Sequence, residues 1–166
     1  MTKSVLFVCT GNTCRSFMAE YLLRRHAQER GLDIEVASAG LAAFPGDTAT
    51  ENALRALEEV GIDGSQHRSR KAELYLLEQY DLILAMTSGH KKQLLSMAPE
   101  LSDRIFLLKE FAETADGQKD PDDSVEKDYE ISDPFGLSLD VYRQSRAEID
   151  LAVQVIVEYL LEEAVM

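Results

Sequence analysis

The chain has 166 residues, 45% of them hydrophobic, with few glycines and prolines and a formal net charge of −13. This length and composition predict one globular domain over residues 1–166 and argue against disorder. The negative charge disfavours nucleic acids and anionic membranes as partners, and apolar runs such as 5–9 and 82–86 are too short to span a bilayer. Because the first residues also lack the pattern of a secretion signal, we expect a cytoplasmic protein. We further expect it to be a monomer.

The hydrophobic pattern begins with a continuous apolar run at residues 4–9, which is typical of a strand buried on both faces. A turn signal, Thr-Gly-Asn-Thr, follows this run. From residue 16 the apolar residues recur at helical spacing until Arg30 and Gly31 end the helix. Further along, the pattern predicts strands at 34–37, 81–86 and 105–108 and helices at 48–60, 72–79, 87–97 and 139–163.

This alternation of strands and helices predicts an α/β fold, a Rossmann-like parallel sheet of four strands with helices on both faces. In such sheets ligands bind at the carboxyl ends of the strands, which is where the turn after residues 4–9 falls. The stretch 113–130 is rich in carboxylates and poor in apolar groups. We interpret it as a solvated acidic loop within the same domain.

Residues 9–16, with the sequence Cys-Thr-Gly-Asn-Thr-Cys-Arg-Ser, join the first strand to the first helix and are called the cradle below. The start of a helix offers unpaired amides and a positive dipole end, so it binds anions. Gly11 and Asn12 tolerate left-handed backbone, which lets successive N–H groups converge on one phosphate. Arg15 offers a fork of donors for two phosphate oxygens. These groups also favour the thiolate of Cys9, which can attack phosphorus. The alternative is a buried structural cysteine beside a loop arginine.

The two cysteines, Cys9 and Cys14, are too close in sequence to staple distant parts of a fold, and a cytosolic chain keeps its thiols reduced. A zinc site with four ligands would need histidines from distant positions at no recognisable spacing. We therefore interpret the cysteines as chemically active. Thiolate attack with help from an acid needs no metal and no other cofactor, so we expect none.

These motifs resemble the low-molecular-weight protein tyrosine phosphatase family over nearly the full length of the chain. The resemblance rests on the run from residue 5 to the end of the cradle, Ser-Ala-Gly at 38–40, His-Arg-Ser-Arg at 67–70 and Asp133-Pro134 before the last helix. It implies a four-stranded parallel sheet with flanking helices, as the hydrophobic pattern does. It also implies a phosphatase that acts on phosphorylated proteins through a cysteinyl-phosphate intermediate.

The resemblance implies a role for each matched residue. Cys9 corresponds to the nucleophile, Arg15 to the phosphate-binding arginine, and Asp133 to the general acid that protonates the leaving group and then activates water. Cys14 corresponds to a thiol that forms a reversible disulfide with Cys9, although simple packing at the helix start explains a cysteine there equally well. Ser16 corresponds to a hydroxyl that hydrogen-bonds the thiolate and aids its departure. The other expected roles are contact with substrate (Thr10, Gly11, Asn12, Thr13, Cys14, Ser16 and Phe135) and support of the cradle (Asn12, Ser38 and His67).

Two positions depart from the pattern of tyrosine phosphatases in this family. Phe17 stands where members have proline, which pre-sets the backbone of the first helical turn. We expect lower rigidity there rather than loss of activity. Phe135-Gly136 stands where tyrosine phosphatases have tyrosine after Asp-Pro.

Thr13 bears on the substrate. Tyrosine-specific members carry an aliphatic residue there, and threonine resembles the bacterial protein arginine phosphatases of the same family. A hydroxyl makes the pocket wall polar, which suits a planar, charged phosphoguanidinium better than an aromatic ring. Asp133 can pair with the guanidinium and Phe135 can stack on it. Other marks of that branch are the residues 84–87 with His90-Lys91, 108–110 and 133–136.

Several alternatives stay open at this point. If Thr13 is a neutral variant, the chain is a tyrosine phosphatase. An arsenate reductase shares the fold and the loop, but it passes a disulfide to cysteines further along, and none follows Cys14. A module that only binds phosphorylated residues would lack the nucleophile or the acid, and both Cys9 and Asp133 are present. Taken alone, Asp133 is a turn residue before proline, and His67 an ordinary surface or core histidine.

Overall fold

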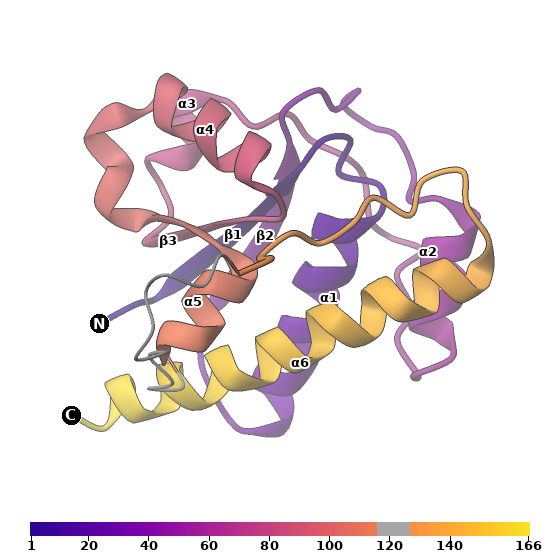
Figure 1. Ribbon diagram of the computed structural model, residues 1–166. Helices are drawn as coiled ribbons and strands as arrows, with labels where there is room; N and C mark the ends of the chain where they lie inside the picture. Colours follow the sequence, from indigo (N-terminus) through magenta and orange to yellow (C-terminus); the bar gives the residue numbers. More distant parts are fainter. Residues whose placement is uncertain (116–126) are drawn as a thin grey trace.

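The computed structural model describes residues 1–115 and 127–166 and contains one parallel sheet. Its strands are β1 (Ser4–Cys9), β2 (Glu35–Gly40), β3 (Leu82–Ala85) and β4 (Ile105–Leu107), in the order β2-β1-β3-β4 (Figure 1). The chain leaves β1 toward β2 on one side and later places β3 on the other. The carboxyl end of β1 is therefore the switch point at which ligands bind in open α/β sheets.

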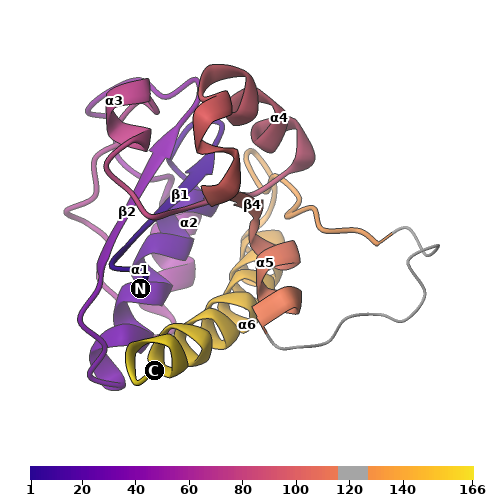
Figure 2. The ribbon, with the colours of Figure 1, turned by 90° about the vertical axis from the view of Figure 1, so that its left-hand side faces the viewer.

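Helices cover both faces of this sheet, as the sequence predicts. Figures 1 and 2 show the long α6 running beside α1 on one face, with α3 and α4 on the other. The helices are α1 (Arg15–Glu29), α2 (Glu51–Glu58), α3 (Leu74–Leu77), α4 (Ser88–Met97), α5 (Leu108–Ala115) and α6 (Leu139–Ala164), with a 3₁₀ helix at Pro99–Arg104. Within the described part of the chain, none of these helices has the length and apolar character needed to cross a membrane.

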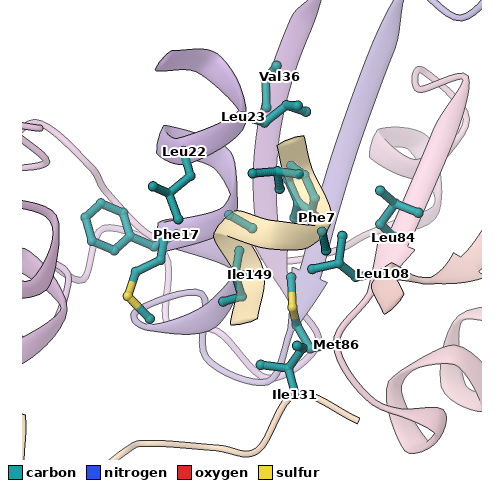
Figure 3. Packing of buried hydrophobic residues seen from close by; sticks show 14 of the residues in the cluster. Phe7, Phe17, Leu22, Leu23, Val36, Leu84, Met86, Leu108, Ile131 and Ile149 are labelled. Atoms are coloured by element: carbon teal, nitrogen blue, oxygen red, sulfur yellow. The ribbon is translucent and has the colours of Figure 1, made fainter. Parts of the chain in front are cut away.

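The alternation of side chains along β1 feeds two separate hydrophobic clusters. Val5, Phe7 and Cys9 point toward α1 and α6, while Leu6 and Val8 point toward α3 and α4. Every residue of β1 is buried, which explains its continuous apolar run. Figure 3 shows Phe7 within the larger cluster, together with Phe17, Leu22, Ile149 and other residues from α1, α5 and α6.

The predicted element types are confirmed, but several bounds are wrong. The helix expected at 48–60 spans only Glu51–Glu58, because the side chain of Thr50 caps it by accepting from the Ala53 amide at 3.4 Å. The helix expected at 72–79 is a single turn, α3. The strand expected at 34–37 continues to Gly40, since β2 pairs with β1 along the whole length of β1.

The acidic loop expected at 113–130 needs the largest correction. Its first residues belong to α5, a helix that the sequence analysis missed between β4 and the acidic stretch. Leu108 and Ala112 are buried at helical spacing. The Phe111 ring packs on the Tyr159 ring of α6, with 5.5 Å between the ring centroids. On the far side of the stretch, Lys127 forms an ion pair with Glu113. The middle of the predicted loop, 116–126, lies outside the described residues.

Candidate active site

The cradle lies at the carboxyl end of β1, between that strand and α1. Cys9 is the last residue of β1 and Arg15 the first residue of α1, and their exposed fractions are 2% and 4%. Five loop residues separate them. The strand and the helix thus hold the thiol and the guanidinium at the two ends of one short turn, with the helix start directed at the space between them.

Asn12 gives this turn its shape. Its φ of 58° lies in the left-handed region, which only asparagine, aspartate and glycine occupy readily. Gly11, for which the same backbone was expected, does not have a positive φ. The Asn12 side chain is fully buried: Nδ2 donates to Oγ of Ser16 and of Ser38, both at 2.8 Å, and Oδ1 accepts from the Arg70 amide at 3.0 Å. These bonds fix the strained residue from three directions.

The two serine hydroxyls bonded to Asn12 have their own protons free to donate. Ser16 Oγ lies 2.9 Å from Cys9 Sγ, where it can donate to a thiolate. Ser38 Oγ donates to Oε1 of Glu20 at 2.6 Å, and Glu20 is in turn paired with Arg24. Because Glu20 accepts the Ser38 proton, the Ser38 oxygen is left to accept from the Asn12 amide. The same amide donates to Ser16, so the Ser16 proton is free to be donated to sulfur.

His67 supports the cradle from behind. Its Nε2 donates to the backbone oxygen of Asn12 at 2.7 Å, which also accepts from Ser69 Oγ at 3.1 Å. Burial lowers the pKa of His67, so the ring is neutral near pH 7. The ring of Phe17 packs against it with 4.6 Å between centroids. Phe17 thus contributes packing where the family pattern has proline.

The backbone of the cradle passes so close to Gly40, at the end of β2, that only glycine fits there. A Cβ atom there would lie 2.6 Å from the carbonyl oxygen of Thr10 and 2.8 Å from the amide nitrogen of Asn12. Any side chain would displace the cradle. The Ser-Ala-Gly motif therefore has two separate functions, because Ser38 bonds to Asn12 while Gly40 makes room for the turn.

Asp133 reaches the same place from a segment 124 positions beyond Cys9. The segment is anchored at Ile131, whose amide donates to the Met86 carbonyl at 2.9 Å and whose own carbonyl accepts from Nη1 of Arg15 at 2.9 Å. Oδ2 of Asp133 lies 3.6 Å from Nη2 of Arg15, and its side chain is 53% exposed. Nε of Arg15 is buried without a hydrogen-bond partner among the described residues, which leaves a donor for an incoming anion.

A cavity of about 590 Å³ opens in front of the cradle. Its walls come from the cradle itself, from the connection between β2 and α2, and from the segment before α6: Cys9, Thr10, Gly11, Thr13, Cys14 and Arg15; Ala42, Phe44, Asp47, Thr48, Ala49 and Thr50; Asp133 and Phe135. Phe135 is 66% exposed at this opening. The structure thus brings the expected nucleophile, arginine and acid to one cavity.

Four expected site residues lie away from the cavity instead. Asn12, Ser16, Ser38 and His67 are buried and do not line the cavity. For Ser38 and His67 this agrees with the expected support of the loop. Asn12 and Ser16 were also expected to contact substrate, but they can act on it only through the shape of the loop and through Cys9. The Ser16 hydroxyl lies within hydrogen-bonding distance of the Cys9 sulfur, as the resemblance implies.

His90 of α4 touches the cradle at Thr10, where its Nε2 lies 2.8 Å from the threonine hydroxyl. Burial, followed by the positive charge of Arg15, lowers the pKa of His90 to about 4. Its Nδ1 is buried and has no partner among the described residues. A neutral His90 can hold Thr10 without adding charge to the cavity.

Cys14 lies in a cluster of hydroxyl groups at the start of α1. Its Sγ is 3.4 Å from the hydroxyl of Tyr142 and 3.5 Å from that of Thr50. Burial and the contact with Cys14 raise the pKa of Tyr142 to about 12, so the phenol stays protonated and can donate to sulfur. The thiol is buried but belongs to the cavity wall, which a purely packed core residue would not.

Sequence reasoning assigned no supporting role to Glu20, Ser69, Arg70, His90 or Tyr142. Glu20 and Tyr142 sit in helical patterns in which a polar side chain predicts only solvent exposure, and both are buried. His90 was noted as a mark of the arginine phosphatase branch, without a structural role. Only the tertiary packing brings these residues next to the cradle.

Comparison with known proteins finds related phosphatases. Residues 4–165 match the family described as low molecular weight phosphotyrosine protein phosphatase. The protein-arginine-phosphatase of Bacillus subtilis is 40% identical over 146 residues, which cover 88% of this chain and 89% of that protein. The protein-arginine-phosphatase of Geobacillus stearothermophilus is 39% identical over 98% of this chain and 99% of its own length.

A solved structure, that of the YwlE arginine phosphatase from Geobacillus stearothermophilus, superimposes with a TM-score of 0.84 at 37% sequence identity. The superposition covers 98% of this chain and 96% of that one. The chain belongs to the low molecular weight phosphotyrosine protein phosphatase family. Within it, the chain is similar to these arginine phosphatases over nearly its whole length, and its cysteine-dependent phosphatase chemistry follows from the family.

Proposed function

We propose that this protein hydrolyses phosphoarginine in proteins. The Cys9 thiolate attacks phosphorus, the bond between phosphorus and the guanidino nitrogen breaks, and Asp133 gives its proton to that nitrogen. Arg15 and the loop amides bind the phosphoryl oxygens throughout. In the second step, water attacks the cysteinyl phosphate while Asp133 takes a proton from it. Phosphate leaves, and the thiolate accepts a hydrogen bond from Ser16.

The observation that carries the substrate assignment is the position of Thr13. It lies on the wall of the cavity that also contains Cys9 and Asp133, where its hydroxyl makes the wall polar. Its backbone oxygen accepts from the Thr50 amide at 3.1 Å, which ties this wall to the connection before α2. The similarity to two proteins named as arginine phosphatases supports the same assignment.

We also infer a cytosolic setting. A free thiol at Cys9 is required for attack, and Cys14 lies nearby as a second free thiol. A reducing compartment keeps both in that state. The substrate in this setting is a phosphorylated protein, whose side chain enters the cavity past the exposed Phe135 ring.

The proposal is tested by comparing kcat/KM on one peptide carrying phosphoarginine and on the same peptide carrying phosphotyrosine. Wild type is expected to prefer phosphoarginine, and Thr13→Ile to shift the ratio toward phosphotyrosine by at least about 10-fold, the effect of roughly one lost polar contact. Thr13→Val is the matched control, because it removes the hydroxyl while keeping the size of the side chain.

Two results would contradict the proposal. Wild type that prefers phosphotyrosine would make the chain a tyrosine phosphatase, and an unchanged ratio in Thr13→Ile would remove Thr13 as the determinant. Hydrolysis of p-nitrophenyl phosphate by wild type and its loss in Cys9→Ser separate both outcomes from a module that only binds phosphorylated residues.

A further inference from the structure

The turn at residues 44–47 brings a second carboxylate to the active-site cavity. Asp47 is exposed and lines the same cavity as Cys9 and Asp133. In the described residues, 1–115 and 127–166, its carboxylate takes part in no hydrogen bond and no ion pair. The group is therefore free to bind something that enters the cavity.

Hydrogen bonds tie the backbone of Asp47 to the cradle. The Gly46 amide donates to the Ser69 carbonyl at 2.9 Å, and the Ser69 amide donates to the Asp47 carbonyl at 2.8 Å. The hydroxyl of the same Ser69 donates to the backbone oxygen of Asn12. Gly46 adopts a φ of 92°, which closes the turn. One serine thus connects the backbone of Asp47 to the residue that shapes the phosphate site.

The chemistry of a phosphoarginine substrate calls for such a group. Its guanidinium is a cation next to the phosphorus, whereas the phenyl ring of phosphotyrosine has no charge. Asp133 must be protonated to act as the acid in the first step, and a protonated carboxyl is no anionic partner for the cation. Among the described residues that line the cavity, Asp47 is the other carboxylate, and Arg15 the sole cation.

We propose that Asp47 is a guanidinium-binding residue of the substrate site, which pairs with the cation of phosphoarginine while Asp133 carries the proton. This inference rests on the proposed function. It divides two tasks between two carboxylates: Asp133 transfers the proton and Asp47 supplies the negative charge. It also predicts discrimination against phosphotyrosine, since a desolvated carboxylate without a cation is costly beside an aromatic ring.

The test uses Asp47→Asn, which keeps the shape of the side chain and the backbone bonds of the turn. The expected result is a loss of about 10-fold in kcat/KM on free phosphoarginine and on a phosphoarginine peptide without other charges, corresponding to about one charge-assisted hydrogen bond. Turnover of a neutral phosphotyrosine peptide and of p-nitrophenyl phosphate should stay the same or rise.

Glu51→Gln is the matched control. Glu51 is an exposed carboxylate four positions further along that pairs with Arg55 and does not line the cavity. The Glu51→Gln substitution removes the same charge from the same region of the surface. If both variants lose activity on phosphoarginine to the same extent, the effect is a general field and the proposal is overturned.

The guanidinium that Asp47 binds could also belong to an ordinary arginine beside the phosphorylated residue. A phosphotyrosine peptide with an adjacent arginine distinguishes this source from phosphoarginine itself. If Asp47→Asn weakens only turnover of that peptide and leaves phosphoarginine untouched, Asp47 binds a neighbouring residue and the proposal is wrong. Wild type that does not hydrolyse phosphoarginine at all would instead refute the proposed function itself. Wild type that prefers phosphoarginine, with no change of ratio in Asp47→Asn, would refute only the role of Asp47.

Discussion

The hydroxyl oxygen of Ser16 lies 2.9 Å from the sulfur of Cys9, and both residues are buried. Ser16 also accepts from Asn12 Nδ2 at 2.8 Å, so its remaining hydrogen bond, as donor, goes to sulfur. The reactive thiolate is thus stabilised by a hydroxyl whose orientation is set by a network that extends to Glu20 and Arg24.

Removing that hydroxyl should weaken the nucleophile and leaving group. Ser16→Ala is expected to lower kcat on p-nitrophenyl phosphate by about 10- to 100-fold, since a hydrogen bond to a charged group contributes about 1.5–3 kcal/mol. It should also slow alkylation of Cys9 by iodoacetate at neutral pH. Ser69→Ala is the control, because it removes a buried hydroxyl that bonds to Asn12 but does not touch sulfur. Equal losses in both variants would show that only the loop shape matters.

The tight packing around Phe17, whose ring also lies against His67, can be tested at Gly64. A Cβ atom on Gly64 would lie 2.3 Å from Cζ of Phe17, which is fully buried. Gly64→Ala should therefore destabilise the protein by about 1–3 kcal/mol through overpacking. In the background of Phe17→Leu, the same change should cost less, with a coupling of about 0.5–3 kcal/mol. Urea unfolding of the four proteins of this cycle gives the coupling, and strictly additive costs would disprove the contact.

His90 should make stability depend on pH in mildly acidic solution. Burial first, and then Arg15, lower its pKa to about 4 in the folded protein, against an ordinary value of 6.5, while Asp133 and Glu130 oppose the shift. Below pH 6.5 the unfolded chain thus binds a proton that the folded chain does not. The free energy of unfolding should fall by up to about 3 kcal/mol between pH 6.5 and pH 4, and stay unaffected by His90 above pH 6.5.

Chemical unfolding at a series of pH values, for wild type and His90→Gln, checks this sign. The variant should lose less stability than wild type as the pH falls, because it has no group to protonate at that position. A curve of the same steepness in both proteins would assign the acid sensitivity to other residues.

Cys14 should protect Cys9 during oxidation. Cys14→Ser keeps a hydroxyl near Thr50 and Tyr142 but cannot form a disulfide. After treatment with hydrogen peroxide and then a reductant, wild type should recover most of its starting activity. The variant should recover little of its own, because a sulfenic acid at Cys9 without a partner thiol proceeds to irreversible forms. The recovered fraction, with mass spectrometry of the peptide that contains Cys9, measures the difference. Equal recovery would leave Cys14 as a packing residue.

Much of this site was predictable because it is encoded locally. Cys9, Asn12, Arg15 and Ser16 lie within eight residues, between an apolar strand and a helix, and their chemistry is legible from type and spacing. Asp133 could be assigned only through the resemblance, since an aspartate before proline is by itself a turn signal. The helix α5 was missed because the carboxylates that follow it dominate the local composition, while its stability comes from packing on α6.

The sequence by itself determined the α/β class, the order of the elements and the phosphate-binding turn, because periodicity and turn chemistry are properties of neighbouring residues. Only the tertiary structure decided that Glu20 stands behind Ser38 and Asn12 and that Asp47 lies at the cavity. It also decided the contacts of Ser38, His67 and Asp133, whose roles the family resemblance implies. These relationships depend on burial and on backbone meeting backbone across tens of residues, as where Gly40 makes room for the cradle. The spacing of residues along the chain does not predict such distances.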